Sequence, residues 1–157
     1  MNWLQILGPP LLMALGGVIT WFIKSKIEEL RAIEEKLREE RRNIYAQILD
    51  PYIRLFADLK GKGPSEALSK ITSYDYRKTA FDLNLFGSDE VVRAYNNLMK
   101  YMYRVEATDN QDSTEIIRLW GKLLLEIRKS LGNKKTKLSE FDMLRAMIKD
   151  IEKLEHK

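Results

Sequence analysis

The stretch "NWLQILGPPLLMALGGVITWFIKSK" (Asn2–Lys26) governs the organisation of this 157-residue chain, because it contains one long apolar run. Between Trp3 and Ile23 there is no charged residue, and ten of these twenty-one residues are Leu, Ile, Val or Phe. A helix of this length measures about 31 Å, close to the ~30 Å hydrocarbon thickness of a bilayer. The ten aliphatic and Phe side chains favour insertion by about −3 to −6 kcal/mol in total. The sequence therefore predicts a transmembrane helix over residues 1–23.

Two other interpretations of the run stay open. A secretory signal needs a basic leader and a small-residue cleavage site, whereas only two residues precede this run and bulky residues end it. A helix buried in a soluble core usually shows a polar stripe, and this segment has none. We favour the membrane span, and the positive-inside rule then predicts a single-pass inner-membrane protein with its N-terminus outside and its C-terminal domain cytoplasmic. The predicted interface anchors are Trp3, Trp21, Phe22, Lys24 and Lys26.

The composition of the span favours contact with other helices. Pro9 and Pro10 lack amide donors and should kink or restart the helix, which leaves carbonyl groups that neighbouring protein would have to satisfy in lipid. Small residues, such as the Gly16–Thr20 pair four apart, let helix backbones approach closely. We expect a self-associating span that lines a pore, with the ordinary composition of membrane spans as the alternative explanation. The residues predicted to pack are Gly8, Pro9, Pro10, Ala14, Gly16, Gly17 and Thr20.

Residues 24–60 read as one long charged helix, a stalk between the span and the following domain. Leu30, Leu37 and Ile44 share one heptad position, while the companion position holds Ile27, Glu34, Arg41 and Ile48. Two charges among four residues make a poor two-stranded seam. We therefore expect partner stalks to touch along a narrow stripe only, with a helix that folds back on the domain as the alternative. A kink is predicted near Pro51.

Residues 61–157 predict a helical bundle that packs on the end of the stalk, so the fold class is all-α. The signals are local: Gly61, Gly63 and Pro64 break the chain, Ser65 begins a short helix, Gly87 ends a helix and Ser88 caps the next, Gly132 ends another, and Ser139 begins the last. Apolar residues recur at helical spacing and predict the inward faces. These residues are Val91, Val92, Tyr95, Leu98, Met99, Met102, Ile116, Ile117, Trp120, Leu123, Leu124, Ile127, Phe141, Leu144, Ile148 and Ile151.

The composition argues against most enzyme chemistry. There is no cysteine, and the single histidine, His156, stands next to the C-terminus. Metal sites and catalytic triads built on these residues are therefore not expected. No glycine-rich phosphate loop is present either. We expect no enzyme activity, no cofactor, no metal and no small-molecule substrate.

The net charge of +4 comes from 27 basic and 23 acidic residues that are interleaved, which suits a solvated helical surface better than a nucleic-acid groove. The most basic loop, "NKKTK", places Lys134, Lys135 and Lys137 where they would touch phosphates or anionic lipid head groups. The alternative is a loop that is simply solvated. Nucleic acid is not the expected partner, although a soluble nucleic-acid-binding helical domain with a buried first helix remains a third interpretation of the chain.

The segments "DLNLFGSDEVVRAYNNLM" and "LLLEIRKSLGNKKTKLSEFDML" resemble those of a loose group of small, uncharacterised prokaryotic single-span membrane proteins with a cytoplasmic helical domain. The architecture is also similar to that of CRISPR-associated membrane proteins that assemble into pores beside an RNA-targeting effector. Some of those carry an Arg-x(4–6)-His motif. Here the arginine would have to lie between 149 and 151, where the chain has Lys149, Asp150 and Ile151, so ribonuclease activity is not implied.

The resemblance and the span together predict a homo-oligomeric, pore-forming or membrane-depolarising effector of prokaryotic antiviral defence. Its expected partners are the lipid bilayer and further copies of the same chain. The alternative is a single-span tether whose helical domain recruits a protein partner.

Overall fold

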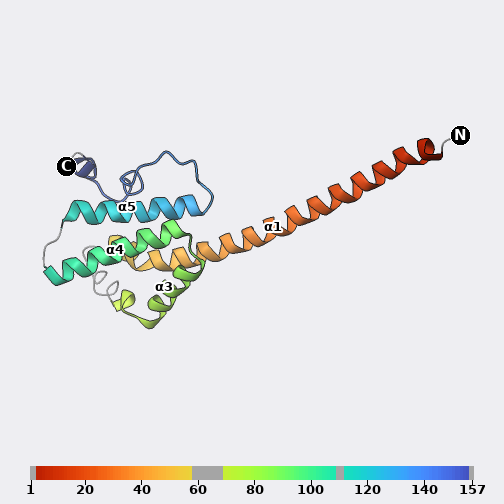
Figure 1. The fold of residues 1–157 in the computed structure, drawn as a ribbon. Helices are drawn as coiled ribbons and strands as arrows, with labels where there is room; N and C mark the ends of the chain where they lie inside the picture. The colour runs from red at the N-terminus through yellow and green to blue at the C-terminus, as the bar shows by residue number, and fades with distance from the viewer. Residues whose placement is uncertain (1–2, 58–68, 109–111, 156–157) are drawn as a thin grey trace. The chain divides into compact units, whose positions relative to one another are not determined.

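The computed structural model describes residues 3–57, 69–108 and 112–155; within them, the side chains of residues 3–12, 14, 55–57, 106–108 and 113 lie outside the description (Figure 1). The described residues form helices and turns and no strand, which confirms the all-α class. The helices are α1 (Trp3–Ala57), α3 (Tyr74–Phe86), α4 (Asp89–Thr108), α5 (Ser113–Ser130) and α6 (Glu152–Glu155).

The chain divides into two compact units, Met1–Leu37 and Arg38–Lys157, and α1 contributes to both. The sequence placed the boundary between stalk and bundle at residue 60. In the structure, residues from Arg38 onward cluster with the bundle, and Ile44 and Ile48 on this part of α1 are buried in its core. The bundle therefore consists of the C-terminal part of α1 together with α3, α4, α5 and the C-terminal segment.

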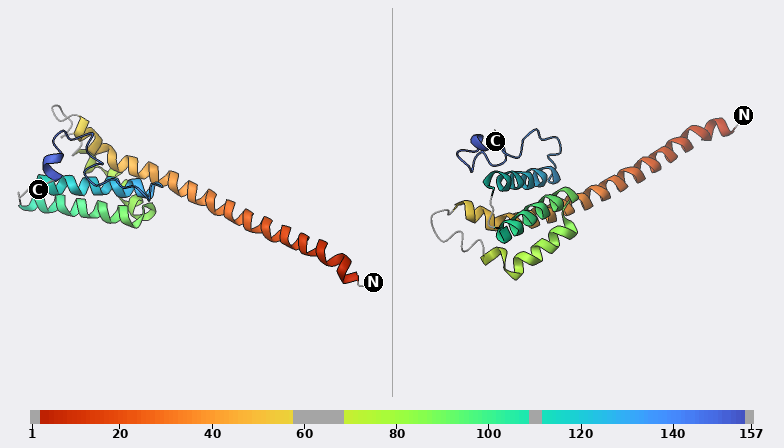
Figure 2. Two further views of the ribbon diagram at one scale, coloured as in Figure 1. Left: turned by 90° about the horizontal axis from the view of Figure 1, so that it is seen from above. Right: turned by 60° about the vertical axis from the view of Figure 1, so that its left-hand side comes forward.

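The core of the second unit is rich in aromatic side chains. Helices α4 and α5 pack against each other and lie side by side in Figures 1 and 2. The rings of Tyr52 on α1 and Trp120 on α5 meet edge to face, with centroids 4.1 Å apart and planes at 72°. Such a pair adds about 0.5–1.5 kcal/mol to the effect of area burial. All sixteen residues predicted to face inward are buried in this core or packed against it.

The ends of the helices follow local sequence signals. The Ser73 hydroxyl accepts a hydrogen bond from the amide of Tyr76 at the start of α3, and the Asp112 carboxylate accepts from the amides of Thr114 and Glu115 at the start of α5. These bonds satisfy amides that have no partner within the helix. As predicted, α3 ends before Gly87 and α4 begins after Ser88. The predicted break at Gly61, Gly63, Pro64 and Ser65 lies outside the described residues.

Gly132 ends α5 in the predicted way. Its φ is +119°, a value that residues with a Cβ rarely adopt. The amide of Gly132 donates to the Lys129 carbonyl at 3.1 Å, and the amide of Asn133 donates to the Arg128 carbonyl at 3.2 Å. This pair of bonds is a Schellman motif, which satisfies carbonyl groups of the last helical turn.

The C-terminal segment corrects one prediction. A helix was expected to begin at Ser139, but residues 140–147 and 149–151 form turns, and only the four-residue α6 is helical. Leu144 and Ile151 are nevertheless fully buried, so the apolar spacing identified the core but not the backbone conformation. The expected start signal is present, since the Ser139 hydroxyl accepts from the amide of Asp142 at 3.1 Å and the Asp142 carboxylate accepts from the amide of Ser139 at 2.8 Å.

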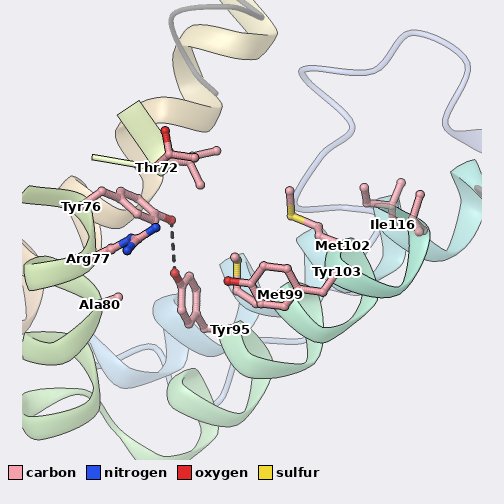
Figure 3. A pocket seen from close by; sticks show the side chains of 11 residues that line it. Thr72, Tyr76, Arg77, Ala80, Tyr95, Met99, Met102, Tyr103 and Ile116 are labelled. Carbon is pink, nitrogen blue, oxygen red and sulfur yellow. Dashed lines mark hydrogen bonds between the residues drawn. The ribbon is translucent and has the colours of Figure 1, made fainter. Parts of the chain in front are cut away.

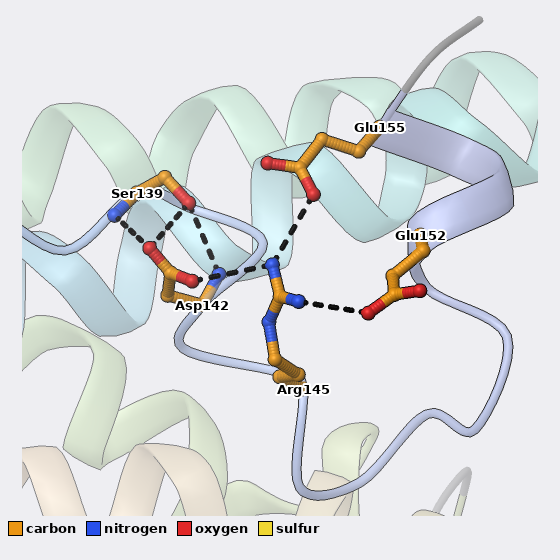
Figure 4. A network of polar contacts seen from close by, with 5 residues as sticks. All are labelled: Ser139, Asp142, Arg145, Glu152 and Glu155. Atoms are coloured by element: carbon orange, nitrogen blue, oxygen red, sulfur yellow. Dashed lines mark hydrogen bonds and ion pairs between the residues drawn. The ribbon is translucent and has the colours of Figure 1, made fainter.

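Arg145 gathers three carboxylates of this segment around its guanidinium (Figure 4). Its guanidinium forms ion pairs with Asp142 at 3.4 Å, Glu152 at 3.1 Å and Glu155 at 3.2 Å. A regular helix would separate Arg145 from Glu155 by about 15 Å along its axis. The folded-back segment brings these carboxylates to one cation instead.

The helix α1 continues through Pro9, Pro10 and Pro51, so none of the three prolines ends it. A bend at these positions stays a prediction. Within the part of the chain that the structure describes, no helix offers an apolar stretch long enough to span a bilayer.

Candidate functional site

The described part of the first unit exposes its large apolar side chains. From Met13 to Leu37, eleven such side chains on α1 have exposed fractions between 36% and 79%. Burial of apolar surface contributes roughly 25 cal/mol per Å², so exposed apolar side chains in this number favour contact with an apolar partner. We call these residues the α1 apolar surface. They are Met13, Leu15, Val18, Ile19, Trp21, Phe22, Ile23, Ile27, Leu30, Ile33 and Leu37.

The predicted small residues of the span have open surroundings in the single chain. A Cβ built on Gly16 or Gly17 would meet nothing within 4 Å. The Thr20 hydroxyl donates to the Gly16 carbonyl at 2.8 Å within α1. The chain itself therefore gives no steric reason for glycine at these positions. Of the other predicted residues of the span, the side chains of Trp3, Pro9, Pro10 and Ala14, and the surroundings of Gly8, lie outside the described residues.

The predicted interface anchors are exposed on α1. Trp21 and Phe22 are 70% and 57% exposed. Lys26 pairs with Glu29 at 2.7 Å, and Lys24 approaches Glu28 at 4.0 Å, both within the helix. Exposed pairs of this kind contribute only about 0–1 kcal/mol each, so the two lysines remain available to an anionic surface.

The apolar stripe of the stalk divides at the boundary between the units. Leu30 and Leu37 are exposed, whereas Ile44 at the same heptad position is buried in the second unit. On the companion position, Ile48 is buried too, and the Arg41 guanidinium donates to the Phe86 carbonyl at 2.6 Å. The exposed part of this heptad stripe therefore ends at Leu37.

The basic loop lies at the C-terminal end of α5. Lys134 and Lys135 line a hollow of about 470 Å³ together with Arg128, whereas Lys137 is exposed outside it. The Arg128 guanidinium donates to the Thr136 hydroxyl at 3.3 Å. A helix C-terminus carries partial negative charge, so nearby cations are stabilised there and nearby anions are destabilised. The anion contact of Lys134, Lys135 and Lys137 stays a prediction.

Three tyrosine hydroxyls from three helices form a buried chain that the sequence did not reveal. Tyr95 donates to Tyr76 at 3.5 Å, Tyr76 donates to Tyr52 at 3.3 Å, and Tyr52 donates to the sulfur of Met99 at 3.7 Å. Burial raises the pKa of all three phenols, that of Tyr52 to about 12. The hydroxyls therefore stay protonated at physiological pH. The helical spacing of Tyr95 predicted that it packs inward, but contact between helices distant in sequence leaves no local signal.

One buried carboxylate belongs to an ion-pair cluster on α5. Glu126 is 7% exposed and accepts from Lys122 and Lys129, each at 3.0 Å. Burial alone would raise the pKa of Glu126, but the two lysines outweigh burial and hold that pKa below its ordinary value. Lys122 also approaches Glu140 at 3.7 Å, so the cluster ties α5 to the C-terminal segment.

Within the described ranges, no three residues among His, Cys, Asp and Glu are placed to hold a metal ion. His156 lies outside these ranges. Comparison with known proteins gave no match: no protein-family model, curated protein or solved structure is significantly similar to this chain.

Proposed function

We propose that the protein is a membrane-anchored homo-oligomer in which the α1 apolar surface contacts lipid over its first part and other copies of α1 over the rest. The observation that carries the proposal is the exposure of Ile27, Leu30, Ile33 and Leu37 beyond the uncharged run, at spacings of three and four residues. The span itself remains a prediction of the sequence. The glycines with open surroundings, Gly16 and Gly17, supply the close-packing positions between spans.

The activity that we propose is membrane permeabilisation, with the assembled spans as the conduit. The setting is prokaryotic antiviral defence, in which such an effector depolarises the membrane after its domain is engaged. This part of the proposal rests on the resemblance in architecture to pore-forming membrane proteins. It rests also on the sequence, in which we expect no catalytic residues. A conduit needs several spans, so subunit number decides whether it is feasible.

The first experiment measures the mass of the detergent-solubilised full-length protein by light scattering corrected for bound detergent. We expect a discrete assembly of several subunits that dissociates in Ile33→Gln. The matched control is Ile53→Gln, because Ile53 lies on the same helix and is 58% exposed, compared with 59% for Ile33. A wild-type monomer would overturn the proposal, and equal effects of the two variants would remove Ile33 from the interface.

Dye release from liposomes tests the activity. The wild-type protein should release dye, and Gly16→Leu with Gly17→Leu should abolish release because bulky side chains prevent close packing of the spans. Replacement of residues 3–23 by an unrelated apolar helix should abolish release as well. If the wild-type assembly forms but releases no dye, permeabilisation is wrong.

The tether is the second candidate, and α3 supplies the observation that favours it. Tyr74, Phe81 and Leu85 stand on this helix with exposed fractions of 79%, 72% and 74%. Their spacings of seven and four place them on one helix face, a pattern typical of helix-in-groove recognition. A tether should function with any span, so cellular activity that survives replacement of residues 3–23 but is lost in Phe81→Ser would favour it over the conduit.

A further inference from the structure

A mainly apolar pocket opens between α3 and α4 in the second unit. Its volume is about 540 Å³, within the range of about 300–1,000 Å³ typical of small-molecule sites. Apolar side chains from three helices line it: Ala80 on α3, Met99, Met102 and Val105 on α4, and Ile116 on α5. Methionine adapts its shape to different apolar groups, so this wall suits a flexible hydrocarbon chain.

One end of the pocket is polar. In Figure 3, the Arg77 side chain and the hydroxyl pair of Tyr76 and Tyr95 lie on one side, and Met102 and Ile116 lie on the other. The side chain of Arg77 forms no ion pair with any carboxylate among the described residues. Its charge is therefore available to an incoming group.

The hydroxyl pair does not compete with Arg77 as a donor. The proton of Tyr95 is directed to Tyr76, and the proton of Tyr76 is directed to Tyr52. The guanidinium carries five N–H donors in a planar arrangement that matches a carboxylate. The pocket thus offers one cationic donor group at the edge of an apolar cavity.

We propose that this pocket binds a monoanionic amphiphile of the fatty-acid class, with its carboxylate on Arg77 and its hydrocarbon chain against Met99 and Met102. The sequence predicted no small-molecule substrate, and this ligand is a bound effector rather than a substrate. The inference is independent of the proposed assembly, because every residue that lines the pocket belongs to the second unit of a single chain.

The test is methyl NMR of the full-length protein in lipid nanodiscs, with ¹³C-labelled methionine methyl groups and decanoate as the probe. We expect saturable shifts of the Met99 and Met102 methyl groups. Met143 and Met147 lie outside the pocket and should not shift, whereas Met13 reports on decanoate that partitions into lipid. Non-saturable shifts, or shifts at Met13 without shifts at Met99 and Met102, would overturn the proposal.

Substitutions then test the head-group assignment. Arg77→Gln should weaken decanoate binding about tenfold, the loss of roughly 1.4 kcal/mol of interaction, and should leave the binding of decan-1-ol unchanged. The matched control is Arg93→Gln, since Arg93 is exposed on α4 and does not line the pocket. Equal binding of acid and alcohol to the wild-type protein, or equal effects of the two arginine substitutions, would refute the anionic class. Because methyl shifts do not depend on the mass of the assembly, a monomeric protein would leave this test intact.

Discussion

The backbone of Glu140 crosses α5 at Gly121 so closely that a Cβ on Gly121 would lie 2.7 Å from the Glu140 carbonyl carbon and would overlap its oxygen. Glycine is therefore required at this position because a side chain has no space, and not because of its backbone φ. This crossing holds the C-terminal segment against α5, and the Lys122–Glu140 pair lies beside it.

Gly121→Ala should destabilise the second unit by about 1–3 kcal/mol, the usual cost of inserting a methyl group into packed structure. In an open helix the same change would stabilise by up to about 1 kcal/mol, because alanine is the better helix former. The measurement is the midpoint of denaturant unfolding followed by Trp fluorescence. A midpoint at or above that of the wild-type protein would show that the crossing is looser than described.

Gly132→Ala tests a different requirement of glycine. No atom lies within 4 Å of the position that its Cβ would take, so space does not restrict the residue. The φ of +119° does restrict the residue, because side chains with a Cβ rarely adopt this value. We therefore expect Gly132→Ala to lower the free energy of unfolding by about 1–2 kcal/mol, measured by thermal unfolding. Asn133→Ala is the control, because Asn133 contributes its backbone amide to the Schellman motif and alanine retains that amide. Equal losses in both variants would contradict the explanation by φ.

Stability should fall in acid through Glu126. Its pKa is depressed in the folded protein, so its contribution is present above the unfolded value of about 4.5 and is lost as pH falls through the lower, folded pKa. Asp50, whose pKa is lowered first of all by the hydrogen bond from Lys70, adds to the same trend. Glu126→Gln should therefore lower the melting temperature at pH 7 but flatten its decline below pH 4.5.

The control for the acid experiment is Glu115→Gln, which removes an exposed pair with Arg118 on the same helix. Such exposed pairs contribute about 0–1 kcal/mol, so the pH profile should barely change. Parallel profiles of the wild-type protein and Glu126→Gln would show that Glu126 does not account for the acid sensitivity.

Local signals predicted the helix ends at Gly87, Ser88 and Gly132, but the start signal at Ser139 is not followed by a helix. Ser88 and Gly132 act on residues within one helical turn of themselves, so their roles can be predicted from the local sequence. The segment after Ser139 has helical spacing in Leu144, Ile148 and Ile151, yet it forms turns, with the Glu140 backbone against Gly121 and Arg145 paired with Glu152.

The same distinction applies to the candidate sites. Trp21, Phe22 and Leu30 are exposed, and their contacts with lipid or with other helices stay predictions. The pocket beside Arg77 depends on how α3 meets α4, and a periodic pattern does not encode that geometry. Ile44 and Ile48 show the limit most clearly, because one heptad pattern serves an exposed stripe and a buried core in succession.

The tyrosine chain makes a graded prediction. Tyr76→Phe removes the acceptor of Tyr95, and leaving that buried hydroxyl without a partner should cost about 1–3 kcal/mol. Tyr95→Phe removes only the first donor of the chain, since Tyr76 still donates to Tyr52, and should cost less. Urea unfolding of both variants at pH 7 gives the order, and a larger loss in Tyr95→Phe would refute the assigned direction of the bonds. Burial raises the pKa of Tyr52 from 10.0 to about 12. The contribution of Tyr52 to the stability of the wild-type protein is therefore present below pH 10 and is lost as pH rises through about 12.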